Sequence, residues 1–257
     1  MAKFKVVVAY QGTEFCGWQR QKSKEKPSIQ EEIEKALSEI LTEKANIVGS
    51  GRTDSGVHAL RQVFVFQTRV SRSPENIRRG LNGLLPENVR VLEVKKVPGR
   101  FHPQHDVKEK AYRYLIQNGP VSNPLLAPYT WFFPERLDVK KMRRAASYLE
   151  GRHNFAAFQD SGRKAKGLPN NSVRTVFHIK VERLPDSIFS TKGLIAVTII
   201  ANGFLYKMVR NIAGTLIEVG RGKMESMRVK EILKSGDRRL AGPTAPARGL
   251  TLLSIKY

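Results

Sequence analysis

Short apolar runs alternate with amphipathic segments over the first hundred residues, and this alternation is the feature that most restricts the fold. The runs at 3–10, 62–70 and 89–97 have the length and composition of strands. Between them, Ser28-Ile29-Gln30-Glu31 forms a capping box ahead of an apolar stripe at helical spacing. Ser73-Pro74 starts a second helix, with proline at its first position. This order predicts helices packed on a sheet.

The second half of the chain mixes strands and helices in a similar way. Strands are expected at 111–117, 177–183, 194–201 and 250–257, and helices at 138–150, 206–219 and 229–234. The proline-rich segment 120–134 is expected to be irregular but packed, because apolar residues such as Leu125 and Leu126 favour burial. We therefore predict an α+β protein of two similar strand-helix subdomains (ferredoxin/RRM-like), residues 1–107 and 108–257. A mainly antiparallel central sheet would join them, with the helices outside.

The charge balance favours a polyanionic partner. Lys and Arg number 45 against 23 Asp and Glu, which gives a formal net charge of +22. The basic residues are spread from Lys3 to Lys256 and form no amphipathic basic helix or tail, so nucleic acid is favoured over a membrane surface. The polar stretch 159–172 carries Arg163, Lys164 and Lys166 and is expected to be a mobile basic loop that contacts RNA.

Composition also argues against several classes of protein. Cys16 is the one cysteine, which excludes a disulfide framework and fits a reducing compartment. No apolar run approaches the ~18 residues of a membrane span, and the amino end lacks a signal pattern, so we expect a cytoplasmic protein. The five histidines lack metal-ligand spacing, and glycine-rich nucleotide motifs are missing. No metal and no cofactor are expected.

Asp54 is the acidic residue with the most informative surroundings. Of the six Asp residues, Asp138, Asp186 and Asp237 are explained by helix caps or turns. Asp54 instead lies in the polar segment 49–59, which contains three glycines, lies between apolar strands and carries Arg52 two residues away. The local pattern fits a turn in which the carboxylate bonds its own backbone, and it also fits a functional loop.

Several motifs occur together in order along the chain. Gly51-Arg52-Thr53-Asp54-Ser55-Gly56-Val57-His58-Ala59 closely resembles the signature loop of the TruA family of tRNA pseudouridine synthases. The resemblance covers essentially the whole chain. It includes Gly17-Trp18-Gln19-Arg20-Gln21, Lys110-Ala111-Tyr112-Arg113-Tyr114, Gly203-Phe204-Leu205-Tyr206-Lys207-Met208-Val209-Arg210-Asn211-Ile212 and Ala245-Pro246-Ala247. Any one motif could arise by chance, but their joint appearance in order is specific.

The resemblance implies an activity and roles for individual residues. It implies isomerisation of uridine to pseudouridine in the tRNA anticodon stem-loop, at tRNA positions 38, 39 and 40, by a homodimer that needs no metal or cofactor. It also implies a basic cleft flanked by the two subdomains. Asp54 would be the nucleophile, Tyr112 would stack on the target base and Arg210 would pair with Asp54. Arg52 would fill the space of the extruded base.

These roles agree with the chemistry. Extruding the base costs a few kcal/mol, and stacking on an aromatic ring returns ~1–3 kcal/mol. The carboxylate could attack C1′ or C6, or act after a glycal has formed. The chain departs from the family pattern at Gln11 and Asn154, where Asp is common, and at Gln104, where Arg is frequent. The change at Gln104 bears on one contact to the RNA backbone.

Two other functions compete with the isomerase. A non-catalytic RNA-binding protein of similar fold would share the charge of +22 and the basic loop. A glycosidase would need a second catalytic carboxylate, and the sequence offers no convincing candidate near Asp54.

Overall fold

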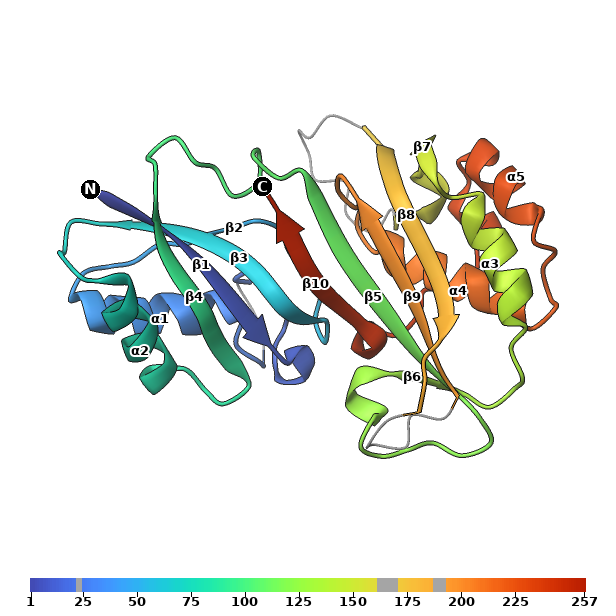
Figure 1. Ribbon diagram of the computed structural model, residues 1–257, viewed down its shortest axis with the longest axis horizontal. Coiled ribbons are helices and arrows are strands. Elements are labelled where there is room, and N and C mark those ends of the chain that lie inside the picture. Colours follow the sequence, from blue (N-terminus) through green and yellow to red (C-terminus); the bar gives the residue numbers. More distant parts are fainter. Residues whose placement is uncertain (22–24, 161–170, 187–192) are drawn as a thin grey trace. The chain divides into compact units, whose positions relative to one another are not determined.

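The computed structural model describes residues 1–21, 25–160, 171–186 and 193–257, and these form two compact units. The first unit comprises Met1–Lys108 together with Thr251–Tyr257, and the second comprises Glu109–Leu250 (Figure 1). The boundary near residue 107 predicted from the sequence puts residues 251–257 in the second half, whereas their contacts place them in the first unit. The last strand pairs in parallel with β3 of that unit.

The sheet of the first unit is mostly antiparallel. Strands β4 (Val89–Val97), β1 (Ala2–Tyr10), β3 (His58–Thr68) and β10 (Leu250–Lys256) lie in that order, and the short β2 (Val48–Gly49) pairs with β3. β1 runs antiparallel to both of its neighbours. β10 joins β3 in parallel, with Thr251 opposite His58 and Leu252 opposite Ala59. The segment that carries Asp54 therefore lies between two paired strands.

Helices α1 (Ile29–Leu41) and α2 (Pro74–Leu84) pack against each other beside this sheet (Figure 1). Ser28 and Glu31 form the predicted capping box, in which each side chain bonds the backbone N–H of the other residue. Pro74 starts α2 as expected. Gly80 permits the close approach of the helices, because a Cβ there would lie 3.0 Å from the Ile40 side chain. Both helix positions were thus predicted from local sequence.

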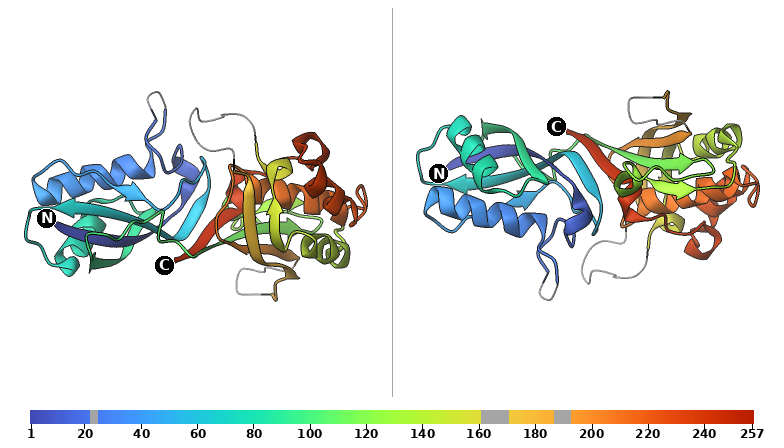
Figure 2. Two further views of the ribbon diagram at one scale, coloured as in Figure 1. Left: turned by 90° about the horizontal axis from the view of Figure 1, so that it is seen from above. Right: turned by 90° about the horizontal axis from the view of Figure 1, so that it is seen from below.

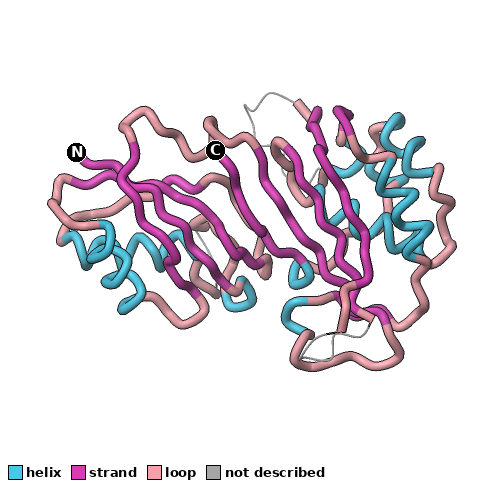
Figure 3. The backbone as a smooth tube through the Cα atoms, viewed as in Figure 1, coloured by secondary structure: helices cyan, strands magenta, loops and turns pink. Residues whose placement is uncertain are grey.

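The strands of the second unit also pair mostly antiparallel. Their order is β5 (Glu109–Asn118), β9 (Leu194–Ala201), β8 (Val173–Arg183) and β7 (Gly151–Asn154), and β6 (Trp131–Phe133) pairs in parallel with β5. Helices α3 (Val139–Ser147), α4 (Met208–Gly220) and α5 (Arg228–Ser235) form one group (Figures 1 and 2). α4 is buried along most of its length. Figure 3 shows the strands and helices of the unit by colour.

Two local expectations were wrong. Segment 120–134 is not wholly irregular, because Trp131–Phe133 forms β6 between Pro128 and Pro134, and Leu125 is 66% exposed rather than packed. The fourth helix begins at Met208 and not at Tyr206, because Lys207 adopts a left-handed conformation with φ 57° that interrupts the helix ahead of it.

The prediction of a mixed α+β fold with mostly antiparallel pairing is confirmed for the described residues, which contain five α-helices. Within those same residues, every helix is too short or too polar to cross a bilayer.

Candidate active site

The Asp54 loop joins β2 to β3 and is held by the chain segment that follows β1. Gly12 and Gly17 allow this segment to touch the loop backbone. A Cβ at Gly12 would lie 2.0 Å from the Val57 carbonyl oxygen, and one at Gly17 would lie 2.7 Å from the Thr53 oxygen. Gly17 also has φ +107°, a left-handed conformation that favours glycine. Gly12 and Gly17 therefore serve backbone contact on both sides of Asp54.

Buried hydrogen bonds fix the residues next to Asp54. The hydroxyls of Tyr10 and Thr53 lie 2.8 Å apart, and the backbone amide of Trp18 donates to the Thr53 carbonyl at 3.0 Å. The Val57 amide donates to the Asp54 carbonyl at 3.2 Å and closes the turn. Burial raises the pKa of Tyr10 to about 12, and hydrogen bonds with Thr53 and Gln62 oppose that rise. The phenol is therefore neutral at physiological pH.

His58 supports the loop structurally, as a buried hydrogen-bond acceptor. The Gly12 amide donates to its Nδ1 at 3.0 Å, and the residue is 3% exposed. On the other side of the loop, Gln62 Nε2 donates to the Gly51 carbonyl at 3.2 Å. These contacts come from β3 and hold the start and the end of the loop, so Asp54 lies on a backbone with restricted movement.

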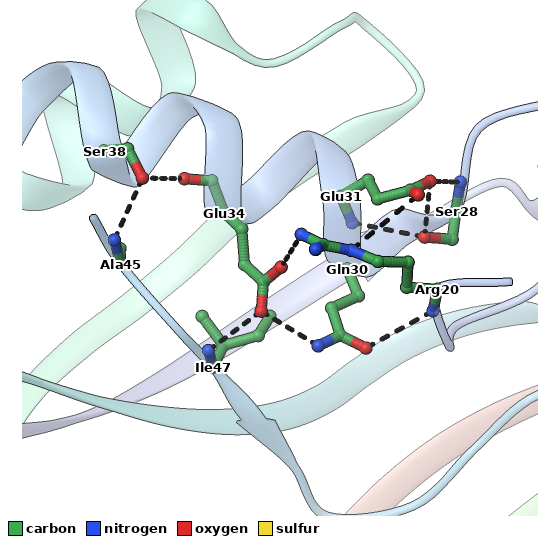
Figure 4. A network of polar contacts seen from close by, with 8 residues as sticks. All are labelled: Arg20, Ser28, Gln30, Glu31, Glu34, Ser38, Ala45 and Ile47. Atoms are coloured by element: carbon green, nitrogen blue, oxygen red, sulfur yellow. Dashed lines mark hydrogen bonds and ion pairs between the residues drawn. The ribbon is translucent and has the colours of Figure 1, made fainter. Parts of the chain in front are cut away.

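A polar network centred on Glu34 anchors the segment that follows Trp18 (Figure 4). Glu34 of α1 is 5% exposed, and its Oε2 lies 2.5 Å from Arg20 Nη2. Its Oε1 accepts hydrogen bonds from Gln30 Nε2 at 2.9 Å and from the Ile47 amide at 3.1 Å. Gln30 Oε1 in turn accepts from the Arg20 amide at 3.4 Å. The network therefore ties α1 both to the segment beside the Asp54 loop and to the chain entering β2.

Asp54 and Arg52 differ in exposure. Asp54 is partly buried, whereas Arg52 is exposed. Arg52 borders a cavity of about 120 Å³ that Gln30 and Gln104 also line, and Gln104 Nε2 donates to the Gly49 carbonyl at 2.9 Å. Pockets for drug-sized ligands measure about 300–1,000 Å³. This cavity is smaller than that range, and Asp54 is not among its lining residues.

Tyr112 lies on β5 in the second unit, opposite Ile199 of β9. It is partly exposed, and its ring meets Phe204 edge to face, with centroids 5.0 Å apart and planes at 83°. Aromatic pairs favour this geometry. Phe204 is only partly buried, and this ring contact orients Tyr112. Met208 and Val209 are buried core residues.

Arg210 lies in the first turn of α4, and its guanidinium is tied to the segment before β10. Arg210 Nε donates to the Ala245 carbonyl at 2.7 Å, and the Ala245 amide donates back to the Arg210 carbonyl at 3.2 Å. The next carbonyl, that of Pro246, accepts from the Tyr114 hydroxyl at 2.8 Å. Burial raises the pKa of Tyr114 above its ordinary range, although Arg210 and Arg248 act against that rise.

Two lysines near these residues have shifted pKa values. Burial lowers the pKa of Lys110, two residues before Tyr112, to about 8. Lys207 precedes α4, and a hydrogen bond to Asp160, with Nζ 2.7 Å from Oδ2, raises its pKa. The Asp160 amide also donates to the Tyr206 carbonyl at 3.2 Å. Asp160, left unassigned by sequence reasoning, therefore holds the chain at the start of α4.

The predicted site residues are divided between the two units. Arg52 and Asp54 belong to the first, and Tyr112 and Arg210 belong to the second. The pairing of Asp54 with Arg210 stays a prediction. Arg163, Lys164 and Lys166 lie outside the described residues. Within the described part of the chain, His, Cys, Asp and Glu side chains form no group of three or more that could hold a metal ion.

The chain matches the model of a family described as tRNA pseudouridine synthase, over residues 6–106 and 145–257. The "tRNA pseudouridine synthase A" of Thermoanaerobacter sp. (strain X514) is 40% identical to it over 257 residues, covering 100% of both chains. That of Brevibacillus brevis is 41% identical, also over the full length of both. The chain belongs to the tRNA pseudouridine synthase family. Pseudouridine synthases are isomerases, so the predicted enzyme class is confirmed.

Similarity to solved structures is weak by comparison. A Cbf5-Nop10-Gar1 complex is 12% identical, with a TM-score of 0.35 over 96% of this chain and 57% of that chain. The fold of this pseudouridine synthase family member therefore rests on its own strand pairing and packing. tRNA is the substrate of the family, which agrees with the net charge of +22.

Proposed function

We propose that the chain isomerises uridine to pseudouridine in the anticodon stem-loop of tRNA, at tRNA positions 38, 39 and 40, with Asp54 as the nucleophile. The observation that carries this proposal is the full-length family match combined with the loop geometry. Asp54 is partly exposed, while its neighbour Thr53 is held in place by hydrogen bonds with Tyr10 and Trp18. A carboxylate on a fixed backbone suits a reaction that depends on accurate positioning.

The reaction needs no net input of atoms or electrons. The bond between N1 of uracil and C1′ of ribose breaks, the base rotates, and C5 bonds to C1′. The proton on C5 is lost, and N1 gains one. Asp54 can serve this sequence by attacking C1′ or C6, or by acting on a glycal intermediate. All three routes start from an ionised carboxylate next to an extruded nucleoside.

The other site residues complete the proposal. Tyr112 stacks on the extruded base, and the edge-on contact with Phe204 restricts its ring. Arg52, which is exposed on the Asp54 loop, fills the space that the base leaves. Arg210 pairs with the Asp54 carboxylate and offsets the cost of burying it when RNA is bound. Arg163, Lys164 and Lys166 contact the RNA backbone.

Replacing Asp54 tests the nucleophile. Asp54→Asn keeps the shape of the side chain and removes its charge, so we expect pseudouridine formation to be lost while tRNA affinity changes by less than about threefold. Product formation and filter binding should be measured at one ionic strength, because RNA binding depends steeply on salt. Asp186→Asn, at an exposed position of the second unit, is the matched control and should retain full activity.

The alternative is a non-catalytic RNA-binding protein. It would be favoured if the wild-type chain bound tRNA and formed no pseudouridine on prolonged incubation. Full activity in Asp54→Asn would instead retain an enzyme but exclude this nucleophile. Mapping pseudouridines in tRNA from cells that lack the protein tests the three positions. The homodimer is a further proposal drawn from the resemblance, and sedimentation of the purified chain tests it. The cytoplasmic location is a proposal drawn from the sequence pattern.

A further inference from the structure

We propose that Asn211, Thr244 and Arg238 are positioning residues that fix the guanidinium of Arg210. They do so by fastening residues 241–246, here called the docking segment, to helix α4. The inference rests on the proposed function, in which Arg210 pairs with the catalytic carboxylate. None of the three residues carried an assigned role in the sequence analysis.

The docking segment holds Arg210 directly. The Arg210 Nε–H and the Ala245 carbonyl oxygen are hydrogen bonded at 2.7 Å, and the backbone bond in the opposite direction measures 3.2 Å. Ala245 is fully buried. A guanidinium bonded through Nε is restricted in rotation about its stem, so its two terminal NH₂ groups take their direction from the Ala245 carbonyl. The position of the docking segment therefore sets the position of the guanidinium.

Asn211 connects α4 to the docking segment. Its side chain is fully buried, and its Nδ2 donates to the Phe158 carbonyl at 2.8 Å. Its Oδ1 accepts from the Thr244 hydroxyl at 2.6 Å and from Arg238 Nη2 at 3.1 Å. All the hydrogen-bonding capacity of Oδ1 is thus directed to residues at the carboxyl side of α5. A buried amide that lost one of these donors would be left partly unsatisfied.

Arg238 ties together the rest of the segment. Its Nη1 donates to the Gly242 carbonyl at 2.9 Å and approaches the Ala241 carbonyl at 3.4 Å, and its Nη2 also donates to the Thr244 hydroxyl at 3.1 Å. Only the planar fork of arginine reaches acceptors in this arrangement, so lysine cannot replace it. One side chain therefore fixes the start of the docking segment and Thr244 together.

Packing leaves the docking segment little freedom. A Cβ at Gly214 of α4 would lie 1.8 Å from the Pro243 carbonyl oxygen, so the segment touches the helix backbone. The Gly242 amide donates to Thr215 Oγ1 at 2.9 Å, and Thr215 Oγ1 donates to the Asn211 carbonyl at 2.8 Å. The polar bonds and the close contact act at the same turn of α4. Loosening the bonds would allow the segment to lift from the helix.

The docking segment also reaches the strand that carries Tyr112. The Ala245 carbonyl holds Arg210, and the Pro246 carbonyl that follows holds the Tyr114 hydroxyl at 2.8 Å. Tyr114 is two residues from Tyr112 on β5, on the same face of the strand. Two successive carbonyls therefore relate the guanidinium to the strand of the stacking tyrosine. Misplacement of a catalytic group by about 1 Å can cost ~10²-fold in rate.

A second site in the same unit has the same chemistry and provides a matched control. Arg183 Nη2 donates to Asn118 Oδ1 at 3.2 Å and to the Leu137 carbonyl at 3.3 Å. It thus bonds an asparagine oxygen and a loop carbonyl, as Arg238 does, but both acceptors lie outside the docking segment. A purely structural effect of losing such a fork would appear equally in Arg183→Lys.

The test compares Arg238→Lys and Thr244→Val with Thr244→Ser and Arg183→Lys. We expect the first two to lower the single-turnover rate of pseudouridine formation by about tenfold to a hundredfold. Their tRNA dissociation constants should stay within about twofold of wild type, because the loss falls on the chemical step. Thr244→Ser keeps the hydroxyl and should restore the rate, and Arg183→Lys should react at the wild-type rate.

Solvent exchange measured by NMR without substrate reports on the Arg210 guanidinium directly. Its Nε–H resonance, identified by its loss in Arg210→Lys, should exchange slowly with solvent in the wild type and in Thr244→Ser. It should exchange at least about tenfold faster in Thr244→Val, because the bond to the Ala245 carbonyl is loosened. A rate loss without faster exchange would overturn the inference, as would an equal rate loss in Arg183→Lys.

The inference and the proposed function can fail separately. If Arg210→Lys reacts at the wild-type rate, the role given to Arg210 in the proposed function is wrong. If Arg210→Lys is slow while Arg238→Lys and Thr244→Val react normally with slow Nε–H exchange, the role of Arg210 stands and the positioning network is excluded.

Discussion

At the scale of single residues, the Tyr10 phenol shows how burial supports the Asp54 loop. Its hydroxyl lies 2.8 Å from that of Thr53, and burial raises its pKa to about 12 from an ordinary value of 10.0. The folded chain therefore holds this proton more tightly than the unfolded chain. The resulting stability is fully present below pH 10 and is lost as the pH rises through 12.

Tyr10→Phe is expected to lower the free energy of unfolding by about 1 kcal/mol near pH 8, because the hydrogen bond to Thr53 is lost. The difference from wild type should shrink between pH 10 and pH 12, where only the wild type loses the contribution of this phenol. Urea unfolding of both chains at pH 8 and pH 11 measures this. Tyr148→Phe in the second unit serves as the control, and a gap that widens with pH would contradict the prediction.

Single residues also show which parts of the candidate site could be predicted from the sequence and which could not. The Asp54 loop, Tyr112 and Arg210 could be named because short motifs carry the family resemblance. Their supports could not, because the partners are distant in sequence. Tyr10 and Thr53 are 43 residues apart, and Asn211 and Thr244 are 33 apart. No local pattern distinguishes an asparagine that will meet a threonine across such a separation from one exposed to solvent.

At the scale of elements, signals within one segment were reliable and pairings between segments were not. The capping box at Ser28 and the proline at the start of α2 predicted both helices of the first unit. β6 and the two-residue β2 were missed, because each exists only through pairing with a longer strand. α4 begins late because Lys207 is left-handed, and its bond to Asp160, 47 residues away, lies beyond any local signal.

Glu34 of α1 gives an element-scale prediction. Its buried carboxylate accepts hydrogen bonds from Arg20, Gln30 and the Ile47 amide. Glu34→Leu removes the carboxylate, so all three donors lose this acceptor. We expect a loss of about 2–3 kcal/mol in the free energy of unfolding, since the buried Ile47 amide is left without this acceptor. Glu34→Gln retains an oxygen and should lose less, about 1 kcal/mol.

Chemical denaturation of these variants provides the measurement. The control is Glu39→Leu, an exposed position on the same helix, which should change stability by no more than about 0.5 kcal/mol. Equal losses in Glu34→Leu and Glu39→Leu would show that the network in Figure 4 contributes no measurable stability.

At the scale of the whole molecule, composition and element order indicated two units and a nucleic-acid partner. They did not indicate that the last strand returns to the first unit. The boundary near residue 107 follows from the order of the segments, but the parallel pairing of β10 with β3 joins residues 193 positions apart, such as Thr251 and His58. Periodicity identifies β10 as a strand and contains no information on which neighbour it pairs with.

Leu252 tests the assignment of β10 to the first unit. It is 1% exposed and lies opposite Ala59, close to the Asp54 loop, so Leu252→Ala should cost about 2–4 kcal/mol. Native-state hydrogen exchange should show reduced protection of amides in β1 and β3, with smaller changes in β8 and β9. Leu253→Ala, at the adjacent and less buried position, should have a lesser effect. Equal loss of protection in both units would mean that they unfold as one cooperative body, and the chain could not then be treated as two units in equilibrium.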